Sequence, residues 1–151
     1  MQHRISAGVI VEHEARLLLV HHVKPGAYDF WVAPGGGVKG SESLEEAAAR
    51  EAREETGLEV QVGKLLYVEE FFNPECRHVK FWFTASLIGG QLNWSHPDAV
   101  AEHITQAAWH ELGTLSGLTV FPSILTTRYA RDSEAGFPQP VRLPLREMTF
   151  W

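Results

Sequence analysis

The sequence predicts a domain of the α/β (α+β) class, built around one mixed β-sheet. Two observations support this prediction. Runs rich in Val, Leu, Tyr, Phe and Trp alternate with polar breaks, as is typical of strands on a half-buried sheet, and one strongly helical segment lies between two of these runs. Strand runs interrupted by helices favour a sheet with helices packed on its faces.

The 151 residues, 44% hydrophobic and 21% charged, fit one folded domain, so we predict a single domain over residues 1–151. The formal net charge is −6 and no basic run is present, which argues against a nucleic-acid polymer as partner. The one cysteine, Cys76, excludes an intramolecular disulfide, and charges interrupt every apolar run near the N-terminus. We therefore expect a cytoplasmic protein without a membrane partner.

The strand-like runs follow one another along most of the chain. Residues 4–22 predict a hairpin around the polar break at 13–16, and residues 23–30 predict a loop. Further strands are expected over 31–37, where an apolar run enters glycines, over 58–72 and 78–90, and over 105–112, where the strand enters a helical turn.

The C-terminal part is rich in proline. Residues 122–131 predict a helix that begins at a proline. Residues 136–151 form a proline-interrupted tail, which we expect to be ordered only against a partner subunit. A homodimer is therefore predicted.

Residues 44–56 predict the principal helix. Ser43 and Glu46 have the spacing of a capping box, so the helix should begin at about Leu44. Gly57 can adopt the left-handed conformation that ends a helix, with Leu58 as the apolar contact that follows it.

The placement of carboxylates on this helix is unusual. A solvated surface helix with i,i+4 ion pairs accounts for Glu46 and Arg50. It does not account for Glu51 and Glu55, which lie on the same face as the apolar and small residues. A carboxylate on a core-facing stripe is costly unless a positive charge compensates it.

Glu51, Glu54 and Glu55 are spaced i, i+3 and i+4, so their oxygens should converge. Hard oxygen ligands without a nearby Cys or His pair favour Mg²⁺ or Mn²⁺. Mg²⁺ usually shares its ligands with substrate phosphates, so a phosphate-containing ligand is expected at this point. The glycines at 35–37 allow the backbone to approach the same helix.

These residues together resemble the complete signature of the Nudix hydrolase family. Gly36 is followed after five residues by Glu42, and after seven more by Arg50-Glu51-Ala52-Arg53-Glu54-Glu55-Thr56-Gly57-Leu58. Only Ala52 departs from the pattern, where the family usually has a larger aliphatic residue. The hairpin at the start and the residues flanking the motif are also similar to the family.

The resemblance implies an α/β/α sandwich with a mixed sheet and a catalytic loop-helix-loop. It implies metal-dependent hydrolysis of the pyrophosphate linkage in a nucleoside diphosphate joined to another group X. Candidates for the substrate are ADP-ribose, a nucleotide sugar or a nucleoside triphosphate.

By the same resemblance, the metal ligands are Glu51, Glu54, Glu55 and the carbonyl of Gly36. Arg50 would orient a carboxylate, namely Glu54 at i+4. Glu42 corresponds to a supporting glutamate of the family.

The general base stays open between a glutamate of the motif and one in a later loop. Glu54 represents the first possibility and Glu102 the second, with Glu69 and Glu70 as weaker candidates. An ordinary solvated acid is an equally good interpretation of Glu102.

Candidate substrate contacts are Gly36, Gly37 and Pro74. Pro74 lies 16 residues after Leu58, a spacing that resembles the marker proline of the ADP-ribose pyrophosphatase subgroup. His21 and His22 lie at a strand end where they can reach a phosphate, but exposure to solvent or a structural role is the favoured interpretation. Several aromatic residues can stack on a base, although strand alternation places most of them in the core: Phe71, Phe72, Phe81, Trp82, Phe83 and Trp94.

Two other classes of function remain open at this point. One is a nucleotide-binding regulatory module of the same fold without catalysis. The other is an interaction domain with a purely structural acidic helix, which would bind no divalent ion at Glu51 or Glu55.

Overall fold

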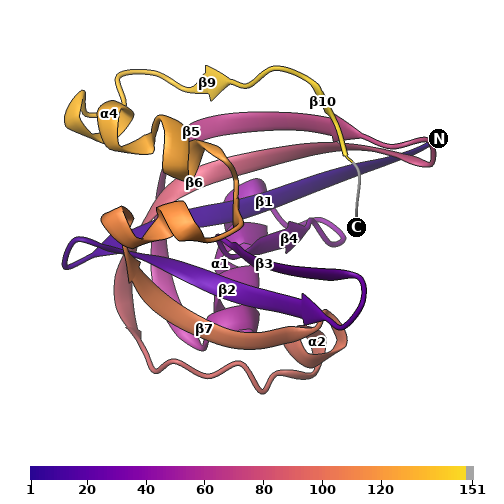
Figure 1. Cartoon of the computed structure of the whole chain (residues 1–151), viewed down its shortest axis with the longest axis horizontal. Helices are drawn as coiled ribbons and strands as arrows, with labels where there is room; N and C mark the ends of the chain where they lie inside the picture. The colour runs from indigo at the N-terminus through magenta and orange to yellow at the C-terminus, as the bar shows by residue number, and fades with distance from the viewer. Residues whose placement is uncertain (149–151) are drawn as a thin grey trace.

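The computed structural model describes residues 1–148 of the chain (Figure 1). The strands are β1 (Gln2–His13), β2 (Arg16–Lys24), β3 (Tyr28–Val32), β4 (Gly35–Gly37), β5 (Leu58–Phe72), β6 (Cys76–Gly90), β7 (Ile104–Glu111), β8 (Val120–Phe121), β9 (Val141–Arg142) and β10 (Arg146–Glu147). The helices are α1 (Leu44–Thr56), α2 (Pro97–Ala101), the 3₁₀ helix η1 (Leu112–Gly117), α3 (Ile124–Thr127) and α4 (Tyr129–Glu134).

The strands form a mixed, curled sheet, as the sequence predicts. Its main path within the described residues runs β10-β5-β6-β1-β2-β3-β8, with β4 beside β1, β7 beside β2 and β9 beside β5. The long strands β5 and β6 form an antiparallel hairpin, and β6 pairs in parallel with β1. Figure 1 shows this upper arm of the sheet and the lower arm made by β2, β3 and β7 diverging from a common side.

The predicted hairpin at the start of the chain is confirmed. β1 and β2 pair next to a two-residue turn at Glu14 and Ala15, whose φ values are 51° and 60°. Two consecutive positive φ angles match the twist of the flanking strands. The predicted bounds of the loop over 23–30 are wrong. The loop is shorter, because β2 continues to Lys24 and β3 begins at Tyr28.

Two cores lie on opposite faces of the sheet. On one face, α1 packs the small residues Ala47, Ala48 and Ala52 against β1, β5 and β6. On the other face, Tyr67 and Trp82 belong to a core that is closed by η1, α3 and α4. The expected alternation in β6 is confirmed, since Phe83 belongs to the first core and Trp82 to the second.

The C-terminal region differs from the prediction in two respects. The single helix expected over 122–131 is broken at Arg128, whose φ of −136° separates α3 from α4. The tail does not need a partner subunit for order up to residue 148, because β9 and β10 pair in parallel with β5 of the same chain. The last residues of the tail, 149–151, lie outside the described residues, and the homodimer stays a prediction.

Candidate active site

Helix α1 has the ends that its sequence predicts. Ser43 Oγ accepts from the Glu46 amide at 3.1 Å, while the Glu46 carboxylate accepts from the Ser43 amide at 2.7 Å. Gly57, with φ of 76°, closes the other end through its amide, which donates to the Arg53 carbonyl. The departure at Ala52 creates no gap, because Ala52 is fully buried in the small-residue contact with the sheet. The two caps determine where α1 begins and ends, and therefore where the carboxylates of Glu51, Glu54 and Glu55 lie.

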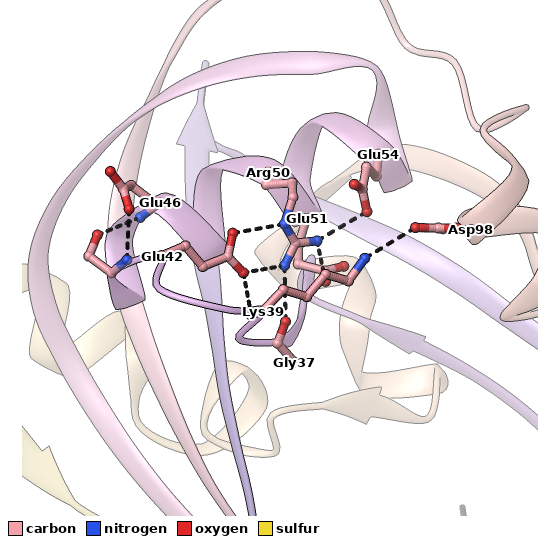
Figure 2. A network of polar contacts seen from close by, with 9 residues as sticks. Gly37, Lys39, Glu42, Glu46, Arg50, Glu51, Glu54 and Asp98 are labelled. Carbon is pink, nitrogen blue, oxygen red and sulfur yellow. Dashed lines mark hydrogen bonds and ion pairs between the residues drawn. The ribbon is translucent and has the colours of Figure 1, made fainter.

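Arg50 is the centre of the polar network at this helix (Figure 2). Its guanidinium donates to both oxygens of Glu42, to Glu51 Oε1 at 2.8 Å and to Glu54 Oε2 at 3.2 Å. A further bond runs from Nη2 to the Gly37 carbonyl at 3.0 Å. The predicted pair with Glu54 is therefore confirmed, but Glu42 is the stronger partner.

The charge of Arg50 has a direct effect on Glu42. Its hydrogen bonds lower the pKa of the Glu42 carboxyl to about 2, and the Lys39 amide contributes in the same direction. Glu46 is occupied by the capping box and does not provide the i,i+4 partner that the sequence indicated.

Glu51 and Glu55 are buried, with only 5% and 3% of their surface exposed. Glu55 Oε2 accepts from the Gly35 amide at 3.3 Å, while Glu55 Oε1 is buried without a hydrogen-bond partner among residues 1–148. Burial, followed by the charges of Glu51 and Glu102, raises the pKa of Glu55 well above its ordinary value. A buried carboxylate oxygen of this kind requires a cation or a proton.

Gly36 lies directly against this carboxylate pair. A Cβ at position 36 would come within 2.5 Å of the Glu51 carboxyl carbon, so only glycine leaves the carboxylate in place. β4 pairs with β1, which holds the Gly36 backbone rigidly beside the helix. These oxygens fit a hard divalent cation, because the orphaned Glu55 Oε1, Glu51 and a nearby backbone carbonyl are all oxygen donors.

The predicted convergence of Glu54 with Glu51 and Glu55 is not found, because within the described residues these three carboxylates do not form one compact group. The Glu54 carboxylate, the His96 ring and the Asp98 carboxylate each have one ligand atom within 4.8 Å of the others. No local pattern predicts His96 at this position, since it comes from a distant segment, at the start of α2. Asp98 already pairs with the Lys39 ammonium at 3.3 Å.

A small cavity of about 40 Å³ opens beside the glycines. Glu102, at the C-terminal end of α2, lines this cavity, and burial and the charge of Glu51 raise its pKa. The weaker candidates for the general base, Glu69 and Glu70, lie elsewhere. Glu69 accepts from Trp82 Nε1, and Glu70 pairs with Arg77. The structure thus brings Glu102 toward the carboxylate helix and leaves Glu69 and Glu70 outside the cavity lining.

Of the candidate substrate contacts, some line this cavity and others lie outside it. Gly36 lines the cavity, whereas the Gly37 carbonyl accepts from Arg50. Pro74 lies in the turn between β5 and β6, outside the residues that line the cavity. His22 lines it, and its Nδ1 bonds to the Glu102 carbonyl at 3.1 Å, whereas His21 pairs with Asp29 at 2.6 Å.

The family model described as the NUDIX domain matches residues 2–128, which is most of the chain. The chain belongs to the Nudix family. The match includes α1, the glycines of β4 and Glu102, so it covers the residues of the candidate site.

Relatives of the Nudix chain are named as a MutT-like protein, an 8-oxo-dGDP phosphatase and an ADP-ribose pyrophosphatase. A MutT-like protein of Streptomyces ambofaciens is 32% identical over 114 residues, covering 69% of this chain and 71% of that protein. An 8-oxo-dGDP phosphatase, NUDT18 of Danio rerio, is 38% identical over 58% of this chain, but the chain spans only 26% of that longer protein. An ADP-ribose pyrophosphatase of Methanocaldococcus jannaschii is 34% identical over 58% of this chain and 53% of that protein.

Solved Nudix structures confirm the fold. A NUDIX hydrolase from Nitrosomonas europaea superposes with a TM-score of 0.71 at 19% identity, covering 93% of this chain and 94% of that chain. A MutT NUDIX hydrolase from Burkholderia pseudomallei gives a TM-score of 0.63 at 27% identity over 75% of this chain and 86% of that chain. The domain match and the MutT-like relative place the chain among the Nudix hydrolases, which argues against an interaction domain unrelated to that family. No helix within residues 1–148 is both long and apolar enough to cross a bilayer.

No pattern in the sequence indicated the floor of the cavity in the candidate site. Arg4, Ser6, His78 and Lys80 line it from β1 and β6. Each pair is spaced i, i+2, which is the only signal in the sequence. Their meeting depends on the parallel register of two strands separated by more than 60 residues, and no local pattern predicts that register.

Proposed function

We propose that this chain hydrolyses the pyrophosphate linkage of a nucleoside diphosphate joined to another group X. The observation that supports this most directly is the buried, unpartnered Glu55 Oε1 beside Glu51 and Gly36. Such an arrangement is explained if divalent cations and a diphosphate complete it, whereas a purely structural helix gives no reason for two carboxylates to be buried side by side.

In this proposal, Mg²⁺ or Mn²⁺ is held by Glu51, Glu54, Glu55 and the Gly36 carbonyl. When bound, the ion neutralises the diphosphate, polarises the attacked P–O unit and lowers the pKa of the attacking water. The bridging P–O bond breaks, and the leaving phosphate carries away its electron pair.

Arg50 positions the ligands. Its bonds to Glu51 and Glu54 hold two carboxylates on one guanidinium, while Glu42 keeps the guanidinium in its orientation. Arg50 is therefore a positioning residue, because its donors are directed at protein oxygens.

Glu102 is the better-supported general base. It lines the same cavity as Gly35 and Gly36, and it makes no ion pair within residues 1–148. A carboxyl whose pKa is raised toward neutrality is suited to accept the proton of the attacking water. Glu54, the alternative, is held by Arg50 and faces His96 and Asp98.

The relatives indicate the substrate class broadly, as a nucleoside diphosphate derivative. Proteins named for 8-oxo-dGDP and ADP-ribose are similar to this chain in sequence, and a UDP-X diphosphatase shares its fold with a TM-score of 0.69 at 20% identity. The role of Pro74 as an ADP-ribose marker stays a prediction. So does the homodimer, which sedimentation of full-length and tail-deleted chains tests.

The test is a screen of product release from nucleoside triphosphates, ADP-ribose, nucleotide sugars, dinucleotides and dinucleoside polyphosphates. Each substrate is offered with Mg²⁺ or Mn²⁺ to wild type and to Glu55→Gln. Metal-dependent turnover that is lost in Glu55→Gln supports the proposal, and the products identify X. Ligand binding without turnover across the whole panel would instead favour a regulatory module.

A further inference from the structure

Four polar side chains share one face of the sheet beside the glycines. In the parallel register of β1 and β6, Arg4 lies opposite His78 and Ser6 opposite Lys80. Residues two apart on a strand point to the same face, so these four side chains form a compact group, here called the basic floor. They lie on the same face as Trp82, which belongs to the core on the side of the sheet away from α1.

Lys80 is the buried cation of the basic floor. Only 8% of its surface is exposed, and its ammonium lies 4.3 Å from the centroid of the Trp82 ring. Within residues 1–148 its ammonium makes neither an ion pair nor a hydrogen bond. Its cross-strand neighbour Glu69 instead accepts from Trp82 Nε1 and pairs with Arg146.

A largely buried lysine whose ammonium has neither an ion pair nor a hydrogen bond is costly, so its presence requires an explanation; the ammonium nitrogen is not among the fully buried unpartnered atoms, so it is open to the cavity. Burial lowers the pKa of Lys80, and the charges of Glu55 and Glu69 partly oppose this effect. An anion in the cavity would provide the missing hydrogen bonds and favour the charged ammonium. The unsatisfied donor therefore points to a ligand.

Arg4 supplies a second unpaired cation at the mouth of the cavity. Its guanidinium lies over Gly37, where a Cβ would come within 3.3 Å of Nε, and it makes no ion pair within the described part of the chain. Of the described residues that line the cavity, Glu102 alone carries a carboxylate. Counted over residues 1–148, the cavity thus has one carboxylate, that of Glu102, and two cationic side chains, those of Arg4 and Lys80. The imidazoles of His22 and His78 also line it.

The size of the cavity limits what can enter it. At about 40 Å³ it holds about three waters, enough for a phosphate or carboxylate group but not for a purine. A neighbouring hollow of about 220 Å³ shares Arg4, His22 and Glu102 with the cavity and is lined by Tyr28, Phe30 and His103. An aromatic or sugar portion of a ligand fits the hollow, with its charged end directed into the cavity.

We propose that the basic floor, through Lys80 and Arg4, binds an anionic group of the substrate other than the diphosphate that is cleaved. X, or the nucleoside, then carries an additional phosphate monoester or carboxylate. This inference rests on the proposed hydrolase function for its biological meaning, but the anion site itself does not depend on turnover.

The first experiment measures binding of inorganic phosphate to the full chain by calorimetry in the presence of EDTA. Without a divalent ion, the carboxylates of α1 repel phosphate, so binding reports the basic floor. Wild type is expected to bind phosphate, and Lys80→Met and Arg4→Gln are expected to bind it at least tenfold more weakly. Lys24→Gln, which removes an exposed lysine outside the cavity, should match wild type.

Folding of the variants is followed by circular dichroism. Arg4 is exposed, so Arg4→Gln keeps the test decisive if Lys80→Met does not fold. Absence of phosphate binding to wild type, or equal binding by wild type and both variants, would overturn the inference.

The second experiment separates the two sources of the anion. UDP-glucuronate is compared with UDP-glucose for a carboxylate, and NADPH with NADH for a phosphate monoester. The charged member of one pair should have the lower KM, and Lys80→Met should raise that KM at least tenfold while leaving the KM of the uncharged member unchanged. An equal rise for both members of each pair would contradict the inference. If neither these four compounds nor any member of the panel in the proposed-function screen is hydrolysed, the hydrolase proposal fails, and phosphate binding still decides the anion site.

Discussion

Arg50 and Glu42 form a two-pronged ion pair, with Nε to Oε2 at 3.0 Å and Nη2 to Oε1 at 2.6 Å. Glu42 precedes α1 and Arg50 lies in its middle, so this pair ties the loop after β4 to the helix. Because Arg50 also bonds to Gly37, Glu51 and Glu54, the pair controls the placement of glycines and carboxylates together.

Arg50→Lys is expected to destabilise the protein by about 2 kcal/mol, since a lysine cannot reproduce the planar two-pronged bond. Urea unfolding measures the effect. Arg53→Lys is the matched control, because its pair with Glu59 is longer, at 3.6 Å, and exposed; a change of less than about 0.5 kcal/mol is expected there. Equal effects at both positions would contradict the role of Arg50.

Gly36→Ala is expected to reduce turnover on the order of 100-fold, because the added Cβ displaces the Glu51 carboxyl. The melting temperature should change little, since the displaced atoms are the end of a side chain. Gly89→Ala is the control, as a Cβ there meets nothing within 4 Å. A loss of stability that accounts for the lost activity would show that the glycine serves folding only.

Glu55→Gln should leave the metal-free protein at least as stable as wild type, because it removes a buried charge beside Glu51 and Glu102. Mg²⁺ should raise the melting temperature of wild type but not of the variant, as expected for a ligand that binds the native state. Glu45→Gln, on the exposed face of α1, should keep the response to Mg²⁺. An unchanged response in Glu55→Gln would remove Glu55 from the metal site.

His22 should make stability depend on pH in the weakly acidic range. Burial lowers its pKa from 6.5 to about 4, so its contribution is fully present above pH 6.5 and is lost as the pH falls toward 4. Between pH 7 and pH 5, wild type should lose about 2 kcal/mol more than His22→Gln. His3→Gln, at an exposed histidine, should behave like wild type, and parallel curves for wild type and His22→Gln would contradict the prediction.

The ends of α1 could be predicted because capping is local. Ser43, Glu46 and Gly57 act through backbone groups within four residues, so their spacing alone determines the result. The burial of Glu51 and Glu55 was predictable for the same reason, since it follows from helical periodicity.

The partners of Arg50 and the basic floor were less accessible to sequence reasoning. Glu42 reaches Arg50 from a loop whose path no periodicity describes, so the i,i+4 rule selected Glu54 and Glu46 instead. Lys80 and Arg4 meet through strand register, a tertiary property. The break at Arg128 has no local sequence signal, and the Asp132 carboxylate beside it accepts from Arg128 Nε and from the hydroxyl of Tyr67, which is far away in sequence.

The two short strands of the tail have a consequence for how this protein behaves in a crowded solution. An uncovered edge of the 15-residue strand β5 would be a template for pairing with another chain. β9 and β10 occupy parts of this edge with only two residues each, and Pro138, Pro140 and Pro144 lie around them and lack an amide donor. The tail therefore opposes aggregation through this edge of β5. It ends the sheet with segments that are too short and too irregular for a strand of another chain to pair with.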